Sequence, residues 1–141
     1  MVLGGVTIAG SRGLEGHSDA DAIAHALTDA VLGAAVEDDI GTLFPDSDPA
    51  NRGRSSIEML ALAVERVQRR GLRVIHADIV VIAEEPRIGP HRAAIRANIA
   101  RALGVSDDAV SVKGKTNEGM GWIGRGEGLA CIAVATLSPM S

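Results

Sequence analysis

The sequence predicts an α+β domain in which a small mixed β-sheet carries helices on one face. Helix-like and strand-like segments alternate along the chain, and its 141 residues match the size of one domain. No linker or internal repeat divides these residues. Helices on a single face leave the other face of the sheet to be buried by something else, and a core poor in aromatic residues also favours burial in an oligomer.

Each element in the first part of the chain follows from a local pattern. Val2–Ile8 is expected to form a short strand. The next helix is expected to begin at the capping residue Ser18 and to reach Ala35, because apolar residues recur there at helical spacing. Glu37–Arg54 has no periodicity, and such a long irregular stretch is more often functional than idle.

The second part has clearer boundaries. Ser55–Glu58 matches a capping box, and its helix is expected to end before a left-handed Gly71. Leu72–Ala83 is rich in Val and Ile and predicts a strand, and a third helix is expected from Pro90 to Gly104. The remaining elements are a strand, a Gly-rich loop and a last strand, at Val110–Lys113, Gly114–Gly128 and Leu129–Leu137.

Composition excludes several classes of protein. The net charge of −4 argues against sequence-independent binding of nucleic acid. Phe44 and Trp122 are the only aromatic residues, which is too few to form a surface on which bases stack. Cys131 is the single cysteine, so neither an intrachain disulfide nor a cysteine zinc cluster is expected. The longest apolar run, Ile79–Ala83, is far below the ~20 residues of a membrane span, and the start lacks a secretory signal. We therefore expect a cytoplasmic protein with no nucleic-acid or membrane partner.

The first polar group with chemical potential is His17, Ser18, Asp21 and His25. The start of a helix attracts phosphate, and a histidine on a helix face is a common metal ligand. Asp21 and His25 are four residues apart and would share a helix face. The alternative is that Ser18 and Asp21 only cap the helix while both histidines face solvent.

Two further segments lie in loops. Acidic residues in Asp38–Gly41 and Phe44–Asp48 are suited to accept hydrogen bonds from sugar or polyol hydroxyls, or else form Asx turns with their own backbone. Ala83–Pro90 follows the end of a strand, where ligands of α/β sheets bind, so its backbone is placed to contact a base edge. An ordinary connection stiffened by proline explains that segment equally well.

The fourth group is the Gly-rich stretch after the third expected strand, Val110–Lys113. Glycines let backbone N–H groups approach phosphates, Thr116 adds a hydroxyl, and Lys115 and Arg125 add positive charge. Glu118 is placed to hold Mg²⁺ against a diphosphate. The stretch matches neither the P-loop nor the dinucleotide fingerprint, and a flexible loop with solvated charges is the alternative.

Taken together, the motifs GHSDAD…H, DIGxLFPDSDP, AxxPRIGPH and KTNEGMGWIGRGEG resemble those of the 2-C-methyl-D-erythritol 2,4-cyclodiphosphate synthases, from Leu3 to Leu137. The resemblance implies a homotrimer packed around a central axis, with three active sites between subunits. It implies cyclisation of 4-diphosphocytidyl-2-C-methyl-D-erythritol 2-phosphate with release of CMP, in non-mevalonate isoprenoid biosynthesis. The alternatives are a catalytically silent trimer that binds cytidine nucleotides or phosphorylated ligands, and a metal-dependent phosphohydrolase.

The resemblance also implies roles for individual residues. His17, with Ser18 beside it, would stabilise phosphate charge in the transition state, and Thr116 would contact the reacting phosphoryl group. The residues implied for the methylerythritol part, where Asp46 is expected on a hydroxyl, are Asp39, Ile40, Gly41, Phe44, Pro45, Asp46, Ser47 and Asp48. Those implied for cytosine, through backbone groups, are Ala83, Glu84, Glu85, Pro86, Arg87, Ile88 and Gly89. Those implied for the diphosphate are Lys115, Thr116, Asn117 and Glu118, with Trp122 and Arg125 lining the site and an axial cavity.

Two metal ions are implied in the same way. Zn²⁺ would be held by His25 together with an Asp-x-His pair on a strand that precedes the equivalent of Val2, and Mg²⁺ or Mn²⁺ would lie between Glu118 and the diphosphate. No Asp-x-His occurs in this sequence, so we expect one domain over residues 1–141 without the family's first strand. Such a chain is either a fragment or a metal-poor relative, and is expected to bind zinc poorly.

Overall fold

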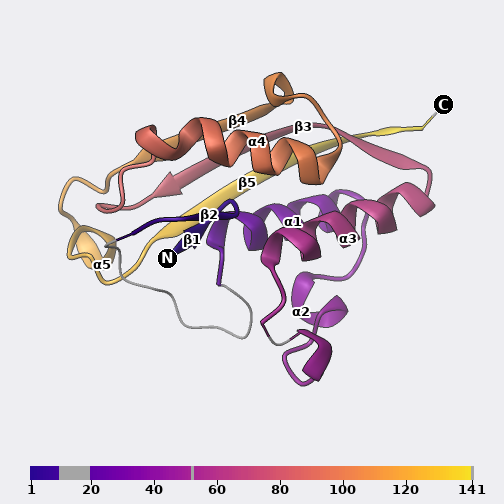
Figure 1. The fold of residues 1–141 in the computed structure, drawn as a ribbon, viewed down its shortest axis with the longest axis horizontal. Coiled ribbons are helices and arrows are strands. Elements are labelled where there is room, and N and C mark those ends of the chain that lie inside the picture. The colour runs from indigo at the N-terminus through magenta and orange to yellow at the C-terminus, as the bar shows by residue number, and fades with distance from the viewer. Residues whose placement is uncertain (10–19, 52, 141) are drawn as a thin grey trace.

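A mixed β-sheet forms one layer of the computed structural model, which describes residues 1–9, 20–51 and 53–140. Within these residues the order of its strands is β4-β3-β5, where β3 is Leu72–Ile82, β4 is Val110–Lys115 and β5 is Ala130–Pro139. β4 runs parallel to β3 and β5 antiparallel to it, as Figure 1 shows. The predicted mixed sheet is confirmed, and β4 and β5 each extend two residues further than expected.

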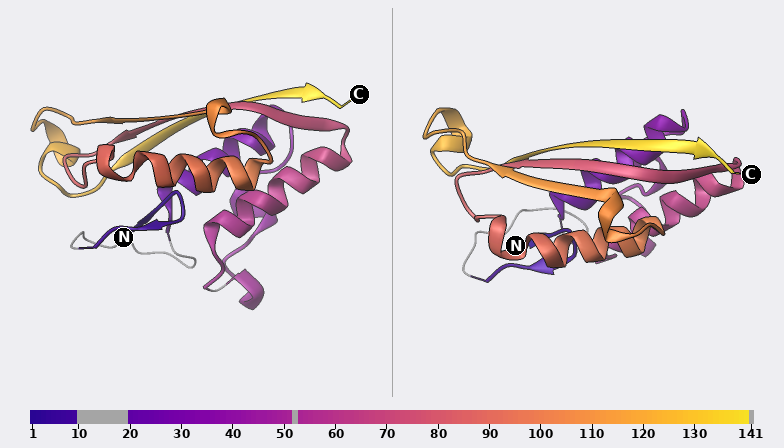
Figure 2. Two further views of the ribbon diagram at one scale, coloured as in Figure 1. Left: turned by 45° about the horizontal axis from the view of Figure 1, so that its top comes forward. Right: turned by 90° about the horizontal axis from the view of Figure 1, so that it is seen from above.

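Three long helices pack on one face of this sheet (Figure 2). They are α1 (Ala22–Ala34), α3 (Ser56–Arg69) and α4 (Arg92–Leu103). The core between helices and sheet is aliphatic, and Leu27, Leu60, Ile79, Ile95 and Ile99 are all 0% exposed. Each fully buried side chain of this size stabilises the fold by roughly 1.5–3 kcal/mol. None of the described helices has the length and apolar character that crossing a membrane requires.

The opposite face of the sheet is not covered by any described helix. The side chains of Ile132 and Val134 on this face are 57% and 59% exposed, and the register places Val80 beside Ile132. On the same face the ammonium of Lys113 lies 3.2 Å from the carboxylate of Asp78. This hydrogen bond from Lys113 lowers the pKa of Asp78. The prediction of an uncovered sheet face is confirmed.

The N-terminal segment differs from the prediction. In place of a single strand over Val2–Ile8, β1 (Val2–Leu3) and β2 (Val6–Thr7) form a small antiparallel hairpin. Gly4 and Gly5 make its two-residue turn with φ of +56° and +75°. Two consecutive positive φ angles are typical of this turn, and glycine adopts them without a Cβ clash.

The first helix also begins later than expected. Its N-cap is Asp21, whose side chain accepts the backbone N–H of Ala24, so the assignment of the cap to Ser18 is wrong. Ser18 itself lies outside the described residues. The third helix likewise begins at Arg92, after a 3-10 turn over Gly89–His91, rather than at Pro90.

Two short helices lie in segments that were expected to be irregular. α2 (Ile40–Leu43) lies inside Glu37–Arg54, and α5 (Gly121–Gly124) lies inside the Gly-rich loop. A 3-10 turn over Pro49–Asn51 adds to the first segment. Single turns of helix are too short for an apolar period to reveal them.

The caps of α3 and α4 were predicted with mixed success. Ser55 occupies the N-cap position of α3 but its side chain makes no capping hydrogen bond, so the predicted capping box is wrong. Gly71 and Gly104 have φ of +80° and +74°, which confirms that each ends a helix in the left-handed conformation.

Candidate active site

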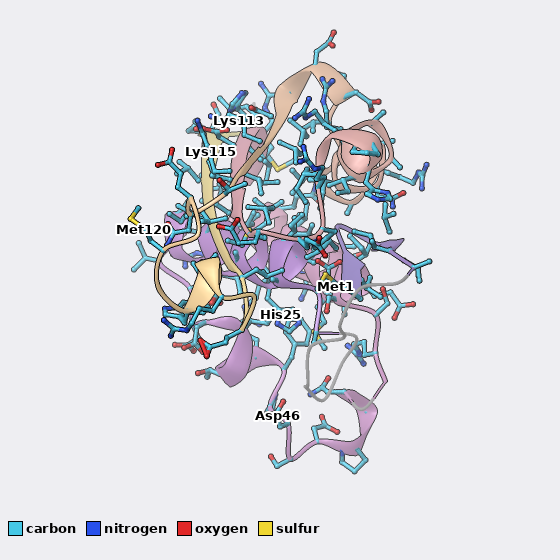
Figure 3. The ribbon with its side chains drawn as sticks, turned by 90° about the vertical axis from the view of Figure 1, so that its left-hand side faces the viewer. Met1, His25, Asp46, Lys113, Lys115 and Met120 are labelled. Carbon is cyan, nitrogen blue, oxygen red and sulfur yellow. The ribbon has the colours of Figure 1, made fainter. Side chains whose placement is uncertain are left out.

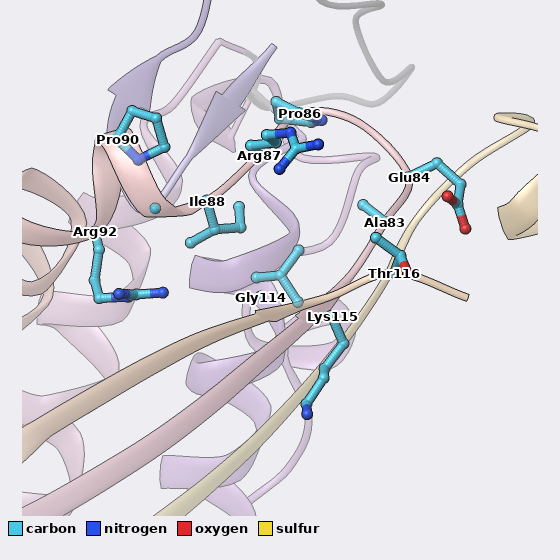
Figure 4. Close-up of a pocket in the computed structure, with 12 residues that line it drawn as sticks. Ala83, Glu84, Pro86, Arg87, Ile88, Pro90, Arg92, Gly114, Lys115 and Thr116 are labelled. Atoms are coloured by element: carbon cyan, nitrogen blue, oxygen red, sulfur yellow. The ribbon is translucent and has the colours of Figure 1, made fainter. Parts of the chain in front are cut away.

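A pocket of about 390 Å³ lies where the parallel strands β3 and β4 end side by side (Figure 4). The backbone N–H of Ala83 donates to the carbonyl of Lys115 at 2.8 Å, which continues the strand pairing one residue beyond β3. The structure thereby brings the segment from Ala83 to Gly89 next to the start of the Gly-rich loop. Ligands of α/β sheets bind at this end of parallel strands.

The walls of the pocket come from both segments and from the start of α4. The lining residues are Val81, Ala83, Glu84, Pro86, Arg87, Ile88, Gly89, Pro90, Arg92, Gly114, Lys115 and Thr116. Gly114 packs closely against Ile88, because a Cβ there would lie 3.0 Å from the Cβ of Ile88. Glu85 belongs to the predicted segment but does not line the pocket.

Positive charge gathers at this pocket. Arg87, Arg92 and Lys115 all line it and are exposed. Their side chains can neutralise the negative charge of a phosphate ester, and the guanidinium groups can bind its oxygens in pairs. Arg92 was missed by the sequence reasoning, although its place two residues after Pro90 was a usable signal.

The loop that follows β4 is held by the side chain of Glu84. Its Oε1 atom accepts the backbone N–H of Asn117 at 2.8 Å and that of Gly119 at 3.2 Å. Between them Glu118 has a φ of +53°, and its N–H donates to the Oγ1 of Thr116 at 3.2 Å. Sequence reasoning gave Glu84 only backbone contacts, because nothing local links it to a loop more than thirty residues away.

His25 lies half-buried on α1, with its Nε2 atom 2.8 Å from the Oγ of Ser56. The expectation that His25 faces solvent, one of the two alternatives, is wrong. His17, predicted as catalytic, and Ser18, predicted as its neighbour on the substrate, both lie outside the described residues.

The carboxylate of Asp21 is not placed for metal binding. It is fully buried and accepts the N–H groups of Gly4, Gly5 and Ala24 at 2.7–3.0 Å. Asp21 is thus a helix cap, as one of the two alternatives had it. Over residues 1–9, 20–51 and 53–140 no group of three or more His, Cys, Asp or Glu side chains is arranged to hold a metal ion.

The segment from Asp38 to Asp48, here called the acidic loop, lies apart from the pocket within a single chain. In Figure 3 Asp46 lies at the lower end, Lys115 towards the upper end, and His25 between them. Asp39 caps α2 by accepting the N–H of Thr42, which lowers the pKa of Asp39, and Asp48 accepts the N–H of Ala50 at 2.9 Å. The local turn alternative therefore describes these two carboxylates. The other predicted residues of this region, on α2 or next to it, are Ile40, Gly41, Phe44, Pro45 and Ser47.

Trp122 and Arg125 do not line the pocket of one chain. Trp122 lies on α5 and is 50% exposed, and the guanidinium of Arg125 pairs with the carboxylate of Glu127 at 2.9 Å. Both side chains are accessible for contacts beyond their own chain.

A mixed-sheet α+β domain with a cationic pocket at the ends of two parallel strands belongs to a class of fold and site that is suited to phosphate esters. Comparisons with known proteins specify the class. The YgbB family model matches residues 1–138. The chain is 58% identical to the 2-C-methyl-D-erythritol 2,4-cyclodiphosphate synthase of Gemmatimonas aurantiaca, over 97% of this chain and 82% of that protein.

Solved structures agree with this match. The bifunctional IspDF of Campylobacter jejuni is similar with a TM-score of 0.95 and 40% identity, over 100% of this chain and 38% of that one. The CDP complex of IspF from Plasmodium falciparum has a TM-score of 0.88 and 36% identity, over 100% of this chain and 85% of that one. The chain belongs to the YgbB family of 2-C-methyl-D-erythritol 2,4-cyclodiphosphate synthases, which are lyases of non-mevalonate isoprenoid biosynthesis. The resemblance stated from the motifs is confirmed.

Proposed function

We propose that this chain cyclises 4-diphosphocytidyl-2-C-methyl-D-erythritol 2-phosphate to the 2,4-cyclodiphosphate and releases CMP. An oxygen of the 2-phosphate attacks the β-phosphorus, and the bond from that phosphorus to the bridging oxygen of CMP breaks. Because a phosphate needs no base to act as nucleophile, positioning and charge neutralisation carry the catalysis. The observation that carries the proposal is the pocket shared by the segment after β3 and the end of β4.

The cytidine diphosphate part of the substrate fits this pocket. The backbone from Ala83 to Gly89 contacts cytosine, and the diphosphate lies against Lys115, Thr116, Asn117 and Glu118. The Thr116 hydroxyl is exposed at the rim and contacts the reacting phosphoryl group. The CDP complex of the Plasmodium falciparum relative supports this choice of ligand. Arg87 and Arg92 add charge on the opposite wall.

The methylerythritol part requires a second chain in this proposal. The acidic loop includes Asp39 and Asp46, and Figure 3 shows Asp46 remote from Lys115 within one chain. A homotrimer whose sheets surround a central axis brings the acidic loop of one subunit to the pocket of the next. The exposed apolar face that carries Ile132 and Val134 supports such an assembly, because burying it removes apolar surface from water. Trp122 and Arg125 then lie near the axis.

The proposed zinc site is only partly represented in the described residues. Of its ligands they include His25, whose Nε2 faces Ser56, and they hold no cluster of three ligands. Catalytic zinc normally takes three protein ligands, and His25 by itself supplies one. The roles of His17 and Ser18 stay predictions from the family motif.

The proposed second cation fits the residues present. Glu118 is exposed at the mouth of the Gly-rich loop and offers one carboxylate. Mg²⁺ and Mn²⁺ typically bind one or two carboxylates together with substrate phosphates, and the bound ion would neutralise charge on the diphosphate.

The test is an assay of the purified chain with the diphosphocytidyl substrate and Mg²⁺. We expect stoichiometric CMP by chromatography and the cyclic diphosphate by ³¹P NMR. CDP is also expected to raise the melting temperature, since a ligand at 100 times its Kd adds about 2.7 kcal/mol. Inorganic phosphate as the product would favour a phosphohydrolase. A CDP-induced shift without CMP release would favour the silent trimer, which the enzyme names of the relatives do not support.

A further inference from the structure

The side chain of Glu84 connects the two walls of the pocket. Glu84 follows the last paired residues of β3, and its half-buried carboxylate reaches the loop after β4. Figure 4 shows this side chain directed away from the strand ends, on the side of Thr116. One oxygen, Oε1, accepts two backbone N–H groups, those of Asn117 and Gly119.

Those two N–H groups flank the residue in the loop with the least common backbone conformation. Glu118 has a φ of +53°, which residues with a Cβ rarely adopt. A left-handed residue in such a turn lets neighbouring N–H groups converge on one anion. In this chain the anion is the carboxylate of Glu84, and it supplies the charge-assisted hydrogen bonds that keep Glu118 in this conformation.

Further contacts hold the loop on either side of Glu118. The Asn117 side-chain amide donates to the carbonyl of Met120 at 2.8 Å, and the N–H of Glu118 donates to the Thr116 hydroxyl. On the far side, Gly124 packs so closely on Gly119 that a Cβ at position 124 would overlap the Gly119 backbone. The turn is therefore held from the α5 side by packing and from the β3 side by Glu84.

We propose that Glu84 is a positioning residue for phosphoryl transfer. Its carboxylate fixes the loop so that the Thr116 hydroxyl and the Glu118 carboxylate meet the diphosphate, and it joins this loop to the wall that contacts cytosine. The inference rests on the proposed function for its catalytic consequence. The hydrogen bonds themselves do not depend on that function.

The decisive variants are Glu84→Ala, which removes the acceptor, and Glu84→Gln, whose amide oxygen can accept the same two N–H groups. We expect Glu84→Ala to lower kcat for CMP release about 10- to 100-fold, because small displacements of reacting groups cost this much. The Kd for CDP is expected to rise by much less than kcat falls, since cytosine still contacts the backbone from Ala83 to Gly89 and only the diphosphate loses its fixed loop. Glu84→Gln is expected to recover most of kcat. Glu65→Ala, which removes an exposed carboxylate on α3, is the matched control and should leave kcat unchanged.

Amide hydrogen exchange supplies a readout without substrate. In Glu84→Ala the N–H groups of Asn117 and Gly119 should exchange faster, while Glu84→Gln and Glu65→Ala keep the wild-type rates. If the wild type releases no CMP, the proposed function fails and exchange still decides whether Glu84 holds the loop.

Three results would overturn the inference. They are unchanged exchange at Asn117 and Gly119 in Glu84→Ala, a Glu84→Gln variant as slow as Glu84→Ala, and much tighter CDP binding in Glu84→Ala. The last would mean that the carboxylate merely occupies a place where the diphosphate binds.

Discussion

The backbone N–H of Gly4 donates to the Oδ1 atom of Asp21 at 2.8 Å, a buried hydrogen bond between the tip of the N-terminal hairpin and the first residue before α1. The same carboxylate accepts Gly5 at 2.7 Å through Oδ2 and Ala24 at 3.0 Å through Oδ1. One side chain thus caps a helix and secures a turn.

We predict that Asp21→Ala lowers the free energy of unfolding by about 3 kcal/mol, since it removes a helix cap and leaves two hairpin N–H groups without their acceptor. The free energy of unfolding of Asp21→Asn is expected to lie between those of the wild type and Asp21→Ala, because the amide donor of the asparagine would face the N–H of Gly5. Urea unfolding at a fixed protein concentration measures the free energy of unfolding of both variants. Asp108→Ala, an exposed control, should change the free energy little. A wild-type midpoint for Asp21→Ala would contradict the double role.

Cys131 is predicted to be unreactive in the folded protein. Burial raises the pKa of its thiol from 9.0 to about 12, and the nearby Asp21 carboxylate adds to this shift. The unfolded thiol ionises first as pH rises, so the contribution to stability is complete below pH 9.0 and is lost towards about 12. Labelling with a thiol reagent near pH 8 should be slow in the native protein and fast in denaturant. Equal rates in the two states would argue against a thiol that the fold partly shields from solvent.

Thr116→Ala is predicted to lower kcat about 100-fold and to weaken CDP binding much less. Its hydroxyl would act where charge shifts in the transition state, and one such donor is typically worth about 3 kcal/mol. Thr116→Ser should retain most of kcat because it keeps the hydroxyl. Steady-state rates and calorimetry with CDP separate the two effects. A Thr116→Ala variant with normal kcat would remove Thr116 from the mechanism.

Removal of divalent metal is predicted to stop CMP release, and Mg²⁺ or Mn²⁺ should restore it. Glu118→Gln is expected to require about tenfold more Mg²⁺ for half-maximal rate, because an amide oxygen binds a hard cation less tightly than a carboxylate. Titration of the chelated enzyme with Mg²⁺ measures the difference. If the variant and the wild type have the same Mg²⁺ requirement, Glu118 is not a ligand.

Ile132→Asp is predicted to dissociate the proposed trimer. Ile132 is 57% exposed in the isolated chain, and a carboxylate in its place would be buried against a neighbouring subunit. Leu62→Asp is the control, since Leu62 is 38% exposed on α3, on the other side of the molecule. Sedimentation velocity should show a slower species only for Ile132→Asp. A wild-type protein that sediments as a monomer would refute the assembly.

The sequence by itself determined the elements whose signals are local. Apolar spacing placed the three long helices, and Gly71 and Gly104 marked two of their ends, because glycine takes a left-handed conformation at little cost. The family and its reaction could also be predicted from the sequence, since four motifs in a fixed order identify them without any knowledge of tertiary contacts. The two segments that form the pocket, from Ala83 to Gly89 and from Gly114 to Thr116, could likewise be predicted from their motifs.

Only the tertiary structure decided which side chains hold the loops in place and which line the pocket. The carboxylate of Asp21, which caps α1, also holds Gly4 and Gly5 because the N-terminal segment folds as a hairpin, whereas Val2–Ile8 was expected to be a continuous strand. Glu84 holds a loop more than thirty residues away, and Arg92 enters the pocket from a helix. Hydrogen bonds of this kind join residues distant in sequence, so no local period or cap predicts them. They form once packing of the sheet against its helices has brought the partners within reach.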